Sequence, residues 1–154
     1  MKLVIRKATF EALQAHACTT YPDECCGMII QRNGREEPIP VTNIQNELHA
    51  KDPVQFPRTA EIAYTMGPEA APILIAAEHG ELQLGAIYHS HPDHDAYFSA
   101  EDRTQALGGW DEPNYPNAAQ IVLSVRDRTL HTAKAFAWDT SACDFVEIRL
   151  IVES

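Results

Sequence analysis

The sequence feature that most constrains this chain is a cluster of potential metal ligands at fixed spacing. His89 and His91 are followed by Pro92, and six residues later come Ser99 and Asp102, which gives the pattern H-x-H-P-x6-S-x2-D. Two imidazoles and one carboxylate are ligand types that zinc prefers, and three protein ligands leave a fourth position for water. The spacing therefore predicts a catalytic metal site that holds one zinc ion per chain.

The residues around the pattern explain how it can form one site. Residues 82–88 are rich in apolar residues and alternate, so they are typical of a strand whose two-residue period places His89 and His91 on the same face. Pro92 lacks an N–H group and favours the end of that strand. Ser99 then fits the N-cap of a helix over residues 100–107, with Asp102 in its first turn.

Each of these residues also has a purely structural interpretation. A histidine at the end of a strand is commonly just half-exposed, and Ser-x-x-Asp is an ordinary capping pattern whose acid suits the helix dipole. Capping alone does not require two histidines about ten residues upstream, so the joint pattern favours the metal site. Glu24, at the entrance of an apolar run, is equally open on its own: such an acid is often a solvated loop residue.

The stretch from His89 to Asp102 resembles the signature of the JAMM, or MPN+, metalloproteases of the small, free-standing prokaryotic type. Residues 22–27 read P-x-E-x-C-G and are similar to the family segment whose glutamate holds the catalytic water. The resemblance implies that His89, His91 and Asp102 bind Zn²⁺. It also implies that Glu24 takes a proton from water and returns it to the leaving nitrogen, and that Ser99 donates a hydrogen bond to the oxyanion.

The same resemblance implies a substrate class and a partner. Members of the family cleave peptide or isopeptide bonds after the C-terminal glycines of ubiquitin-like proteins, and the small prokaryotic members act on sulfur-carrier proteins with a Gly-Gly tail. Two other functions stay open: a catalytically silent MPN-like scaffold for protein assembly, and another metal-dependent amide hydrolase, such as a small-molecule deconjugase or a phage-tail-type peptidase. The P-C-x-x-C motif of zinc deaminases and the H-E-x-x-H motif of other zinc peptidases are both absent.

Length and charge exclude several classes of protein. With 154 residues, of which 45% are hydrophobic, we expect a single domain over residues 1–154. The net charge of −10 argues against nucleic acid or an anionic membrane as partner, because both require a basic surface. No signal peptide or membrane span is evident, and the four cysteines form no C-x-x-C motif, so we expect a cytoplasmic protein with free thiols.

The remaining elements predict an α/β (α+β) fold in which helices pack on one curved mixed sheet, and the resemblance implies a sheet similar to that of cytidine deaminases. Asn33-Gly34 predicts a hairpin turn, and the last third of the chain predicts an antiparallel meander. Residues 45–58 are polar, contain Pro53 and Pro57, and are predicted to be a loop. The other predicted elements are strands over 3–5, 26–30, 37–44, 120–125, 129–138 and 145–152, a helix capped by Thr9, a helical region from Thr59 that Gly67-Pro68 interrupts, and a helix over 69–78.

Overall fold

Seven strands form one curved mixed sheet in the computed structural model, which describes residues 1–154. The strands are β1 (Lys2–Arg6), β2 (Cys26–Arg32), β3 (Arg35–Val41), β4 (Gln83–Pro92), β5 (Ala119–Arg126), β6 (Thr129–Asp139) and β7 (Asp144–Glu153). Their order across the sheet is β1-β7-β6-β5-β4-β2-β3, in which β1 and β7 are parallel, as are β4 and β5. The helices are α1 (Lys7–Thr20), α2 (Gln45–Lys51), α3 (Ala70–Glu78) and α4 (Ala100–Leu107). The predicted fold class is confirmed.

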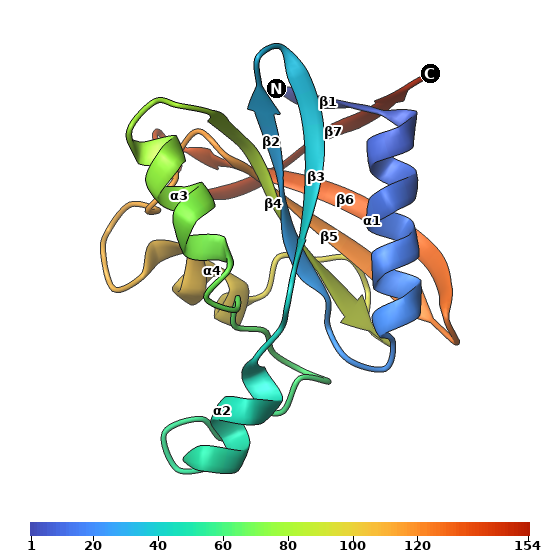
Figure 1. Ribbon diagram of the computed structural model, residues 1–154, viewed down its shortest axis with the longest axis vertical. Coiled ribbons are helices and arrows are strands. Elements are labelled where there is room, and N and C mark those ends of the chain that lie inside the picture. Colours follow the sequence, from blue (N-terminus) through green and yellow to red (C-terminus); the bar gives the residue numbers. More distant parts are fainter.

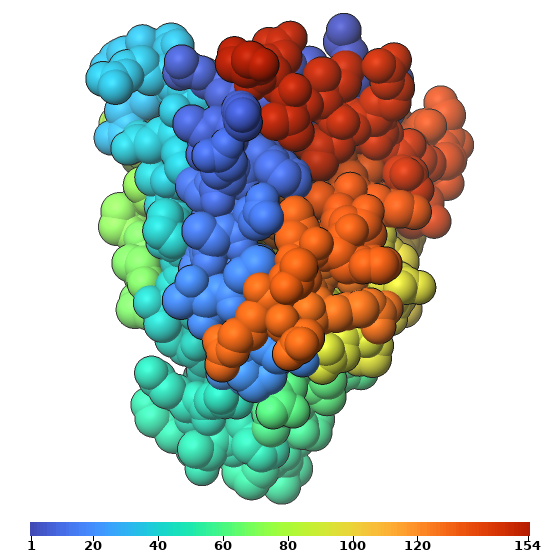
Figure 2. Space-filling model, turned by 90° about the vertical axis from the view of Figure 1, so that its right-hand side faces the viewer, coloured from blue at the N-terminus to red at the C-terminus, as the bar shows by residue number.

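Helix α1 covers one face of the sheet (Figure 1). Its Leu13 and Ala17 are one helical turn apart and pack against alternate side chains of the central strands, among them Ile29, Tyr88 and Ile121. All five are buried. Figure 2 looks onto this side, where α1 lies between β3 and the hairpin of β5 and β6. We call this the α1 face.

The opposite face of the sheet carries α3 and α4 (Figure 1). Met28 and Ile30 of β2 alternate with the residues beneath α1 and pack instead with Ala70 of α3 and with Leu84. Further along the same face, Val122 and Phe136 form a smaller cluster with Ala96. We call this the α4 face, and it is the one that carries the predicted metal ligands.

A β-bulge at Gly85 decides which face the histidines occupy. Two consecutive residues of β2 pair with Ala86 and Leu84, so Gly85 has no partner there. Leu84 packs on the α4 face, whereas Ala86 and Tyr88 pack beneath α1. Because the bulge reverses the alternation, the odd-numbered side chains after Gly85 point to the α4 face, where His89 and His91 lie.

Several predicted elements are confirmed because their local signals are strong. Asn33 and Gly34 both have positive φ, of 52° and 74°, as the two-residue turn between β2 and β3 requires. Helix α4 begins at a capping box formed by Ser99 and Asp102, and it ends at Gly108 in the left-handed conformation. Strands β5, β6 and β7 form the predicted antiparallel meander. The four cysteines are free, as expected.

Three predictions about local structure were wrong. Residues 45–51, predicted to be part of a loop, form α2, because Gln, Glu, Leu, Ala and Lys favour helix even though the helix is too short to show periodicity. Figure 1 shows α2 projecting away from the sheet. Thr9 does not cap α1, which begins at Lys7 directly after β1; the Thr9 hydroxyl instead donates to Glu36 of β3.

The third error concerns the helical region predicted from Thr59. Turns and extended backbone occupy residues 59–67, and Met66 forms a bridge with Asn43. The amide side chains of Asn43 and Asn46 bond backbone groups of this segment: Asn46 Oδ1 accepts from Ala60 N at 2.8 Å, and Asn43 Oδ1 accepts from Thr65 N at 3.1 Å. These long-range bonds satisfy the groups that a helix would otherwise use.

No helix of the chain is both long enough and apolar enough to cross a membrane. The expectation of one domain over residues 1–154 stays a prediction.

Candidate metal centre

The structure brings His89, His91 and Asp102 together in one buried cluster. The two histidines come from β4, which lies between β2 and β5, and Asp102 comes from the first turn of α4. His89 Nε2 lies 3.1 Å from Asp102 Oδ1, and His91 Nε2 lies 3.2 Å from Asp102 Oδ2. The two Nε2 atoms are 3.2 Å apart. Strand, loop and helix therefore direct three ligand atoms to one point.

The capping box of α4 and the predicted ligand set use the same aspartate. Asp102 N donates to Ser99 Oγ at 3.0 Å, and Ser99 N donates to Asp102 Oδ2 at 3.0 Å. The carboxylate is thus held in place by the helix cap while both of its oxygens face the histidines. The capping role of Ser-x-x-Asp and its predicted role in metal binding are therefore compatible, because the cap positions the carboxylate.

The hydrogen bonds of His91 fix which nitrogen faces the centre of the cluster. Its Nδ1 lies 2.9 Å from the carbonyl oxygen of Asp95, which can only accept, so Nδ1 carries a proton and, in the neutral ring, the Nε2 lone pair points inward. His89 stacks on Tyr64 with ring centroids 4.8 Å apart, and its Nδ1 is buried with no hydrogen-bond partner. The ring of His91 makes an edge-to-face contact with Tyr97, and the two ring centroids are 5.2 Å apart.

This arrangement requires positive charge at its centre. The inward lone pair of His91, the carboxylate of Asp102 and the Nε2 atom of His89 repel one another unless a proton or a cation lies between them. A zinc ion with four ligands at about 2.0–2.1 Å has ligand atoms about 3.3 Å apart, close to the observed 3.1–3.2 Å. The three residues could therefore hold a metal ion, and their donor set fits zinc.

The pKa values of the cluster follow from the same geometry. Burial opposes ionisation of Asp102, but its hydrogen bonds with His89 and His91 outweigh burial and hold its pKa below the usual range. Burial lowers the pKa of His89. Burial also acts to lower the pKa of His91, but the contacts with Asp102 and Asp95 overcome it and raise that pKa. The carboxylate is therefore ionised at neutral pH and available as an anionic ligand.

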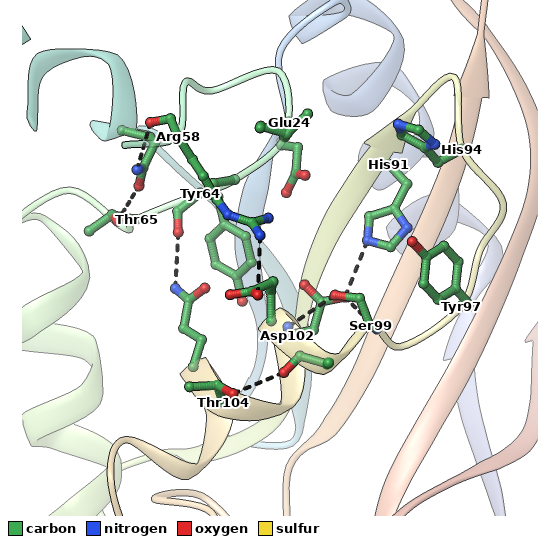
Figure 3. Close-up of a pocket in the computed structure, with 16 residues that line it drawn as sticks. Glu24, Arg58, Tyr64, Thr65, His91, His94, Tyr97, Ser99, Asp102 and Thr104 are labelled. Atoms are coloured by element: carbon green, nitrogen blue, oxygen red, sulfur yellow. Dashed lines mark hydrogen bonds and ion pairs between the residues drawn. The ribbon is translucent and has the colours of Figure 1, made fainter. Parts of the chain in front are cut away.

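Glu24 enters the same pocket from the segment just before β2. Its backbone is fixed on both sides, since Glu24 N donates to Ala60 O at 2.7 Å and Glu24 O accepts from Asn43 Nδ2 at 2.9 Å. Burial raises the pKa of its carboxyl to about 8; Asp102 acts in the same direction, and the positive charges of His91 and Arg58 act against it. Figure 3 shows the carboxyl group pointing into the pocket above the ligand cluster. A carboxyl group in this environment can exchange a proton near neutral pH.

The pocket that contains these residues has a volume of about 780 Å³ and lies between α4 and the segment 58–65. Ser99 lines it, and because Ser99 Oγ already accepts from Asp102 N, its hydroxyl hydrogen is free to donate into the pocket. All five predicted site residues border or form this one site. Other wall residues were not predicted from the sequence; among them, Gln45, Arg58 and Tyr64 come from segments predicted to be a loop or a helix.

Comparison with known proteins agrees with this geometry. The family described as prokaryotic homologs of the JAB domain matches residues 6–139. A protein of Mycobacterium tuberculosis named CysO-cysteine peptidase is 28% identical over 137 residues, which cover 87% of this chain and 81% of that protein. The tail tip assembly protein K of Escherichia phage N15 is 32% identical over 101 residues, or 66% of this chain. The chain spans only 35% of the length of that phage protein.

Solved structures share the fold over the whole chain. A solution structure of a protein from Desulfitobacterium hafniense has a TM-score of 0.67 and 21% identity, and the match covers 100% of this chain and 94% of the other. A crystal structure of a JAB1/MPN domain protein from Archaeoglobus fulgidus has a TM-score of 0.50 and 14% identity, over 98% of this chain and 99% of the other. These matches identify the curved sheet and its helices as the JAB/MPN fold.

Proposed function

Because the chain belongs to the prokaryotic homologs of the JAB domain, we propose that it is a zinc-dependent peptidase that hydrolyses an amide bond. The observation that carries this proposal is the convergence of Glu24 on the cluster of His89, His91 and Asp102 inside one pocket. A metal site alone would serve a structural role equally well. Glu24 is a buried carboxyl group beside three potential ligands, so it can relay a proton from the attacking water to the leaving nitrogen, as hydrolysis requires.

Each side chain of the site has a separate role in the proposed reaction. His89, His91 and Asp102 would hold the ion, which when bound would polarise the attacking water and the substrate carbonyl. Glu24 accepts a proton from the water and delivers it to the leaving nitrogen, so that the amine departs neutral. Ser99 donates its free hydroxyl hydrogen to the carbonyl oxygen as negative charge develops there.

We propose as substrate a ubiquitin-like or sulfur-carrier protein, cleaved after the Gly-Gly sequence at its C-terminus. The family supports an amide substrate, and the relative named CysO-cysteine peptidase supports a peptidase reaction. Glycines present no side chains, so a Gly-Gly tail can bring its main chain close to the buried ligand cluster. We propose the cytoplasm as the location.

A second candidate is another metal-dependent amide hydrolase, of the phage-tail or small-molecule type. The similarity to a tail tip assembly protein favours it, because that match is 32% identical over 101 residues. A catalytically silent scaffold is disfavoured, since His89, His91, Asp102 and Glu24 are all present and lie at one pocket.

The test replaces Glu24 by glutamine, which keeps the size of the side chain but cannot accept a proton at neutral pH. We expect Glu24→Gln to keep its zinc content and melting temperature and to lose about a hundred- to ten-thousandfold in hydrolysis of a carrier with a Gly-Gly-linked peptide. Glu61→Gln is the matched control, because Glu61 is an exposed acid on the neighbouring segment. Turnover of Glu24→Gln close to wild type would refute the role of Glu24, and a zinc-loaded wild type without activity on any carrier would favour the alternatives.

A further inference from the structure

The pocket around the metal centre contains one permanently cationic side chain, Arg58. The other charged side chains in its wall, apart from histidines, are the carboxyl groups of Glu24, Glu101 and Asp102. The whole chain carries a net charge of −10. A single guanidinium in such a strongly acidic setting is the feature of this pocket best suited to bind an anionic group of a substrate.

The backbone of Arg58 is held in place by a chain of half-buried hydrogen bonds. Gln45 is 6% exposed, and its Nε2 donates to Arg58 O at 3.0 Å. Thr65 Oγ1 in turn donates to Gln45 Oε1 at 2.7 Å, which orients the amide. Two residues after Arg58, the carbonyl of Ala60 accepts from Glu24 N at 2.7 Å. The backbone of Arg58 is therefore held at a set distance from the proposed proton carrier.

The present partner of Arg58 is easily exchanged. Arg58 Nη2 lies 3.1 Å from Glu101 Oε1, and the two side chains are 43% and 62% exposed. An ion pair with this exposure contributes little to stability, so a carboxylate of a ligand can replace Glu101 at small cost. Figure 3 shows Arg58 reaching toward the pocket from the same side as Glu24, with Ser99 and Asp102 opposite.

Arg103, on the outer side of α4, provides an instructive contrast. Its side chain is 42% exposed, almost the same as that of Arg58, but it binds both Asp144 Oδ1 at 2.9 Å and the carbonyl of Cys143 at 3.2 Å. It ties α4 to the start of β7 and does not line the pocket. Arg103 thus has the arrangement of a structural arginine, which Arg58 lacks.

We propose that Arg58 binds the free α-carboxylate of the leaving group, so that the preferred substrates are carriers joined through an amide bond to a single amino acid. This inference rests on the proposed function. Glu24 must reach the leaving nitrogen, so the leaving group lies on the side of the pocket lined by Glu24 and by Arg58, whose segment bonds Glu24 N through Ala60 O. In an amino acid the α-carboxylate is two bonds from that nitrogen, which suits neighbouring binding groups.

The reaction balances without a further reactant. One water molecule is consumed and the C–N bond between the terminal glycine and the amino acid is broken. The hydroxyl of the water stays on the glycine as a new carboxyl group, and its proton leaves with the amine through Glu24. Arg58 takes part only by binding, because its guanidinium stays protonated throughout.

The experiment compares two peptides that end in Gly-Gly-Ala, one with a free carboxyl terminus and one with a terminal amide. Affinity is measured by fluorescence anisotropy on the zinc-loaded Glu24→Gln variant, and kcat/KM is measured on the zinc-loaded wild type. We expect the free acid to be preferred about tenfold or more in both measurements, as for a charge-assisted bond. Each further substitution is made in the protein used for that measurement. Arg58→Gln should remove the preference for the free acid, and Arg58→Lys should keep part of it. Glu101→Gln should increase the preference, because it removes the present partner of Arg58.

Controls separate this inference from the proposed function. Arg103→Gln, the matched arginine variant, should keep the full preference for the free acid. Equal binding of acid and amide by the protein with Arg58 intact, or an unchanged preference in Arg58→Gln, would overturn the role of Arg58. A Gly-Gly-Asp peptide with a terminal amide that binds as tightly as the free acid would overturn the assignment to an α-carboxylate. Preferential binding without hydrolysis of either peptide would refute the proposed peptidase and support the carboxylate site alone.

Discussion

The two faces of the sheet differ in what they bury. Beneath α1 the buried side chains are nearly all apolar and come from α1 and from strands β1, β2, β4, β5 and β6. The α4 face also has apolar clusters, but its centre buries His89, His91 and Asp102, with Glu24 at the edge. Buried ionisable groups cost free energy, whereas buried apolar groups supply it. The α1 face therefore stabilises the fold, whereas burial of these ionisable groups on the α4 face costs free energy.

Strand β4 contributes alternate residues to the packing of the α1 face and to the candidate metal site of the α4 face. Tyr88 and Ser90 point to the α1 face, where the Ser90 hydroxyl accepts a hydrogen bond from Cys25 N at 2.7 Å. His89 and His91, the alternate residues, point to the α4 face. The packing of one face thus holds the ligands of the other in position, so variants on each face should separate stability from metal binding.

The largest effect is expected on the α1 face. Leu13 is fully buried between α1 and the sheet, so Leu13→Ala should lower the free energy of unfolding by about 2–5 kcal/mol. Zinc content per folded molecule should stay at the wild-type value. Urea unfolding and metal analysis check both parts. Ile75→Ala on α3, where the side chain is 51% exposed, is the control and should change stability by about 0.5 kcal/mol or less. Loss of zinc from folded Leu13→Ala would show that the two faces are not separable.

The second effect belongs to the α4 face. Zinc at a hundred times its dissociation constant should stabilise the wild type by about 2.7 kcal/mol, because the ion binds the folded state. His91→Ala should abolish this gain and retain the fold measured without zinc. Thermal melting with and without zinc, together with metal analysis, tests the prediction. His94→Ala is the matched control, since His94 lines the pocket but lies outside the ligand cluster. A wild-type response of His91→Ala to zinc would refute the ligand assignment.

The sequence predicted those parts of the site that depend on local structure. The spacing of His89 and His91 in a strand, and of Ser99 and Asp102 in a helix cap, can be read from neighbouring residues alone, and the structure has both. The bulge at Gly85 was not predicted, because it depends on the register of β4 against β2. The predicted alternation placed the two histidines on a common face but did not identify that face.

Long-range contacts account for what the sequence did not reveal. Residues 58–65 complete the pocket because side chains from residues 43–46 bind their backbone groups, and no local pattern encodes those partners. The same contacts place Arg58 and Tyr64 beside the candidate metal ligands. Glu24 was assigned only through the family resemblance, and its proximity to the cluster depends on the pairing of β2 with β4.

A smaller effect should come from Ser99, where the cap and the proposed chemistry meet. Ser99→Ala removes the acceptor for Asp102 N and should lower the free energy of unfolding by about 1 kcal/mol. It should also reduce turnover by about a hundredfold through the lost oxyanion donor. Ser99→Thr keeps both functions of the hydroxyl and is the control. Urea unfolding and kinetics on one carrier substrate measure the two effects, and full turnover in a destabilised Ser99→Ala would leave Ser99 as a cap alone.

The smallest effect should come from His16, the histidine of the α1 face. His16 Nδ1 lies 2.7 Å from the Tyr88 hydroxyl, and burial lowers the pKa of His16 from its ordinary value of 6.5. As the pH falls below about 6.5, the unfolded chain therefore takes up a proton at this residue before the folded protein does. Neutral His16 contributes stability that is complete above this pH and is lost as the pH falls toward the folded-state pKa.

His16→Gln cannot titrate, so its free energy of unfolding should fall less between pH 7 and 5 than that of the wild type. Chemical unfolding across this pH range measures the difference, with His131→Gln as a control at an exposed histidine. Identical pH dependence of wild type and His16→Gln would show that burial of His16 does not contribute to the acid sensitivity of the α1 face.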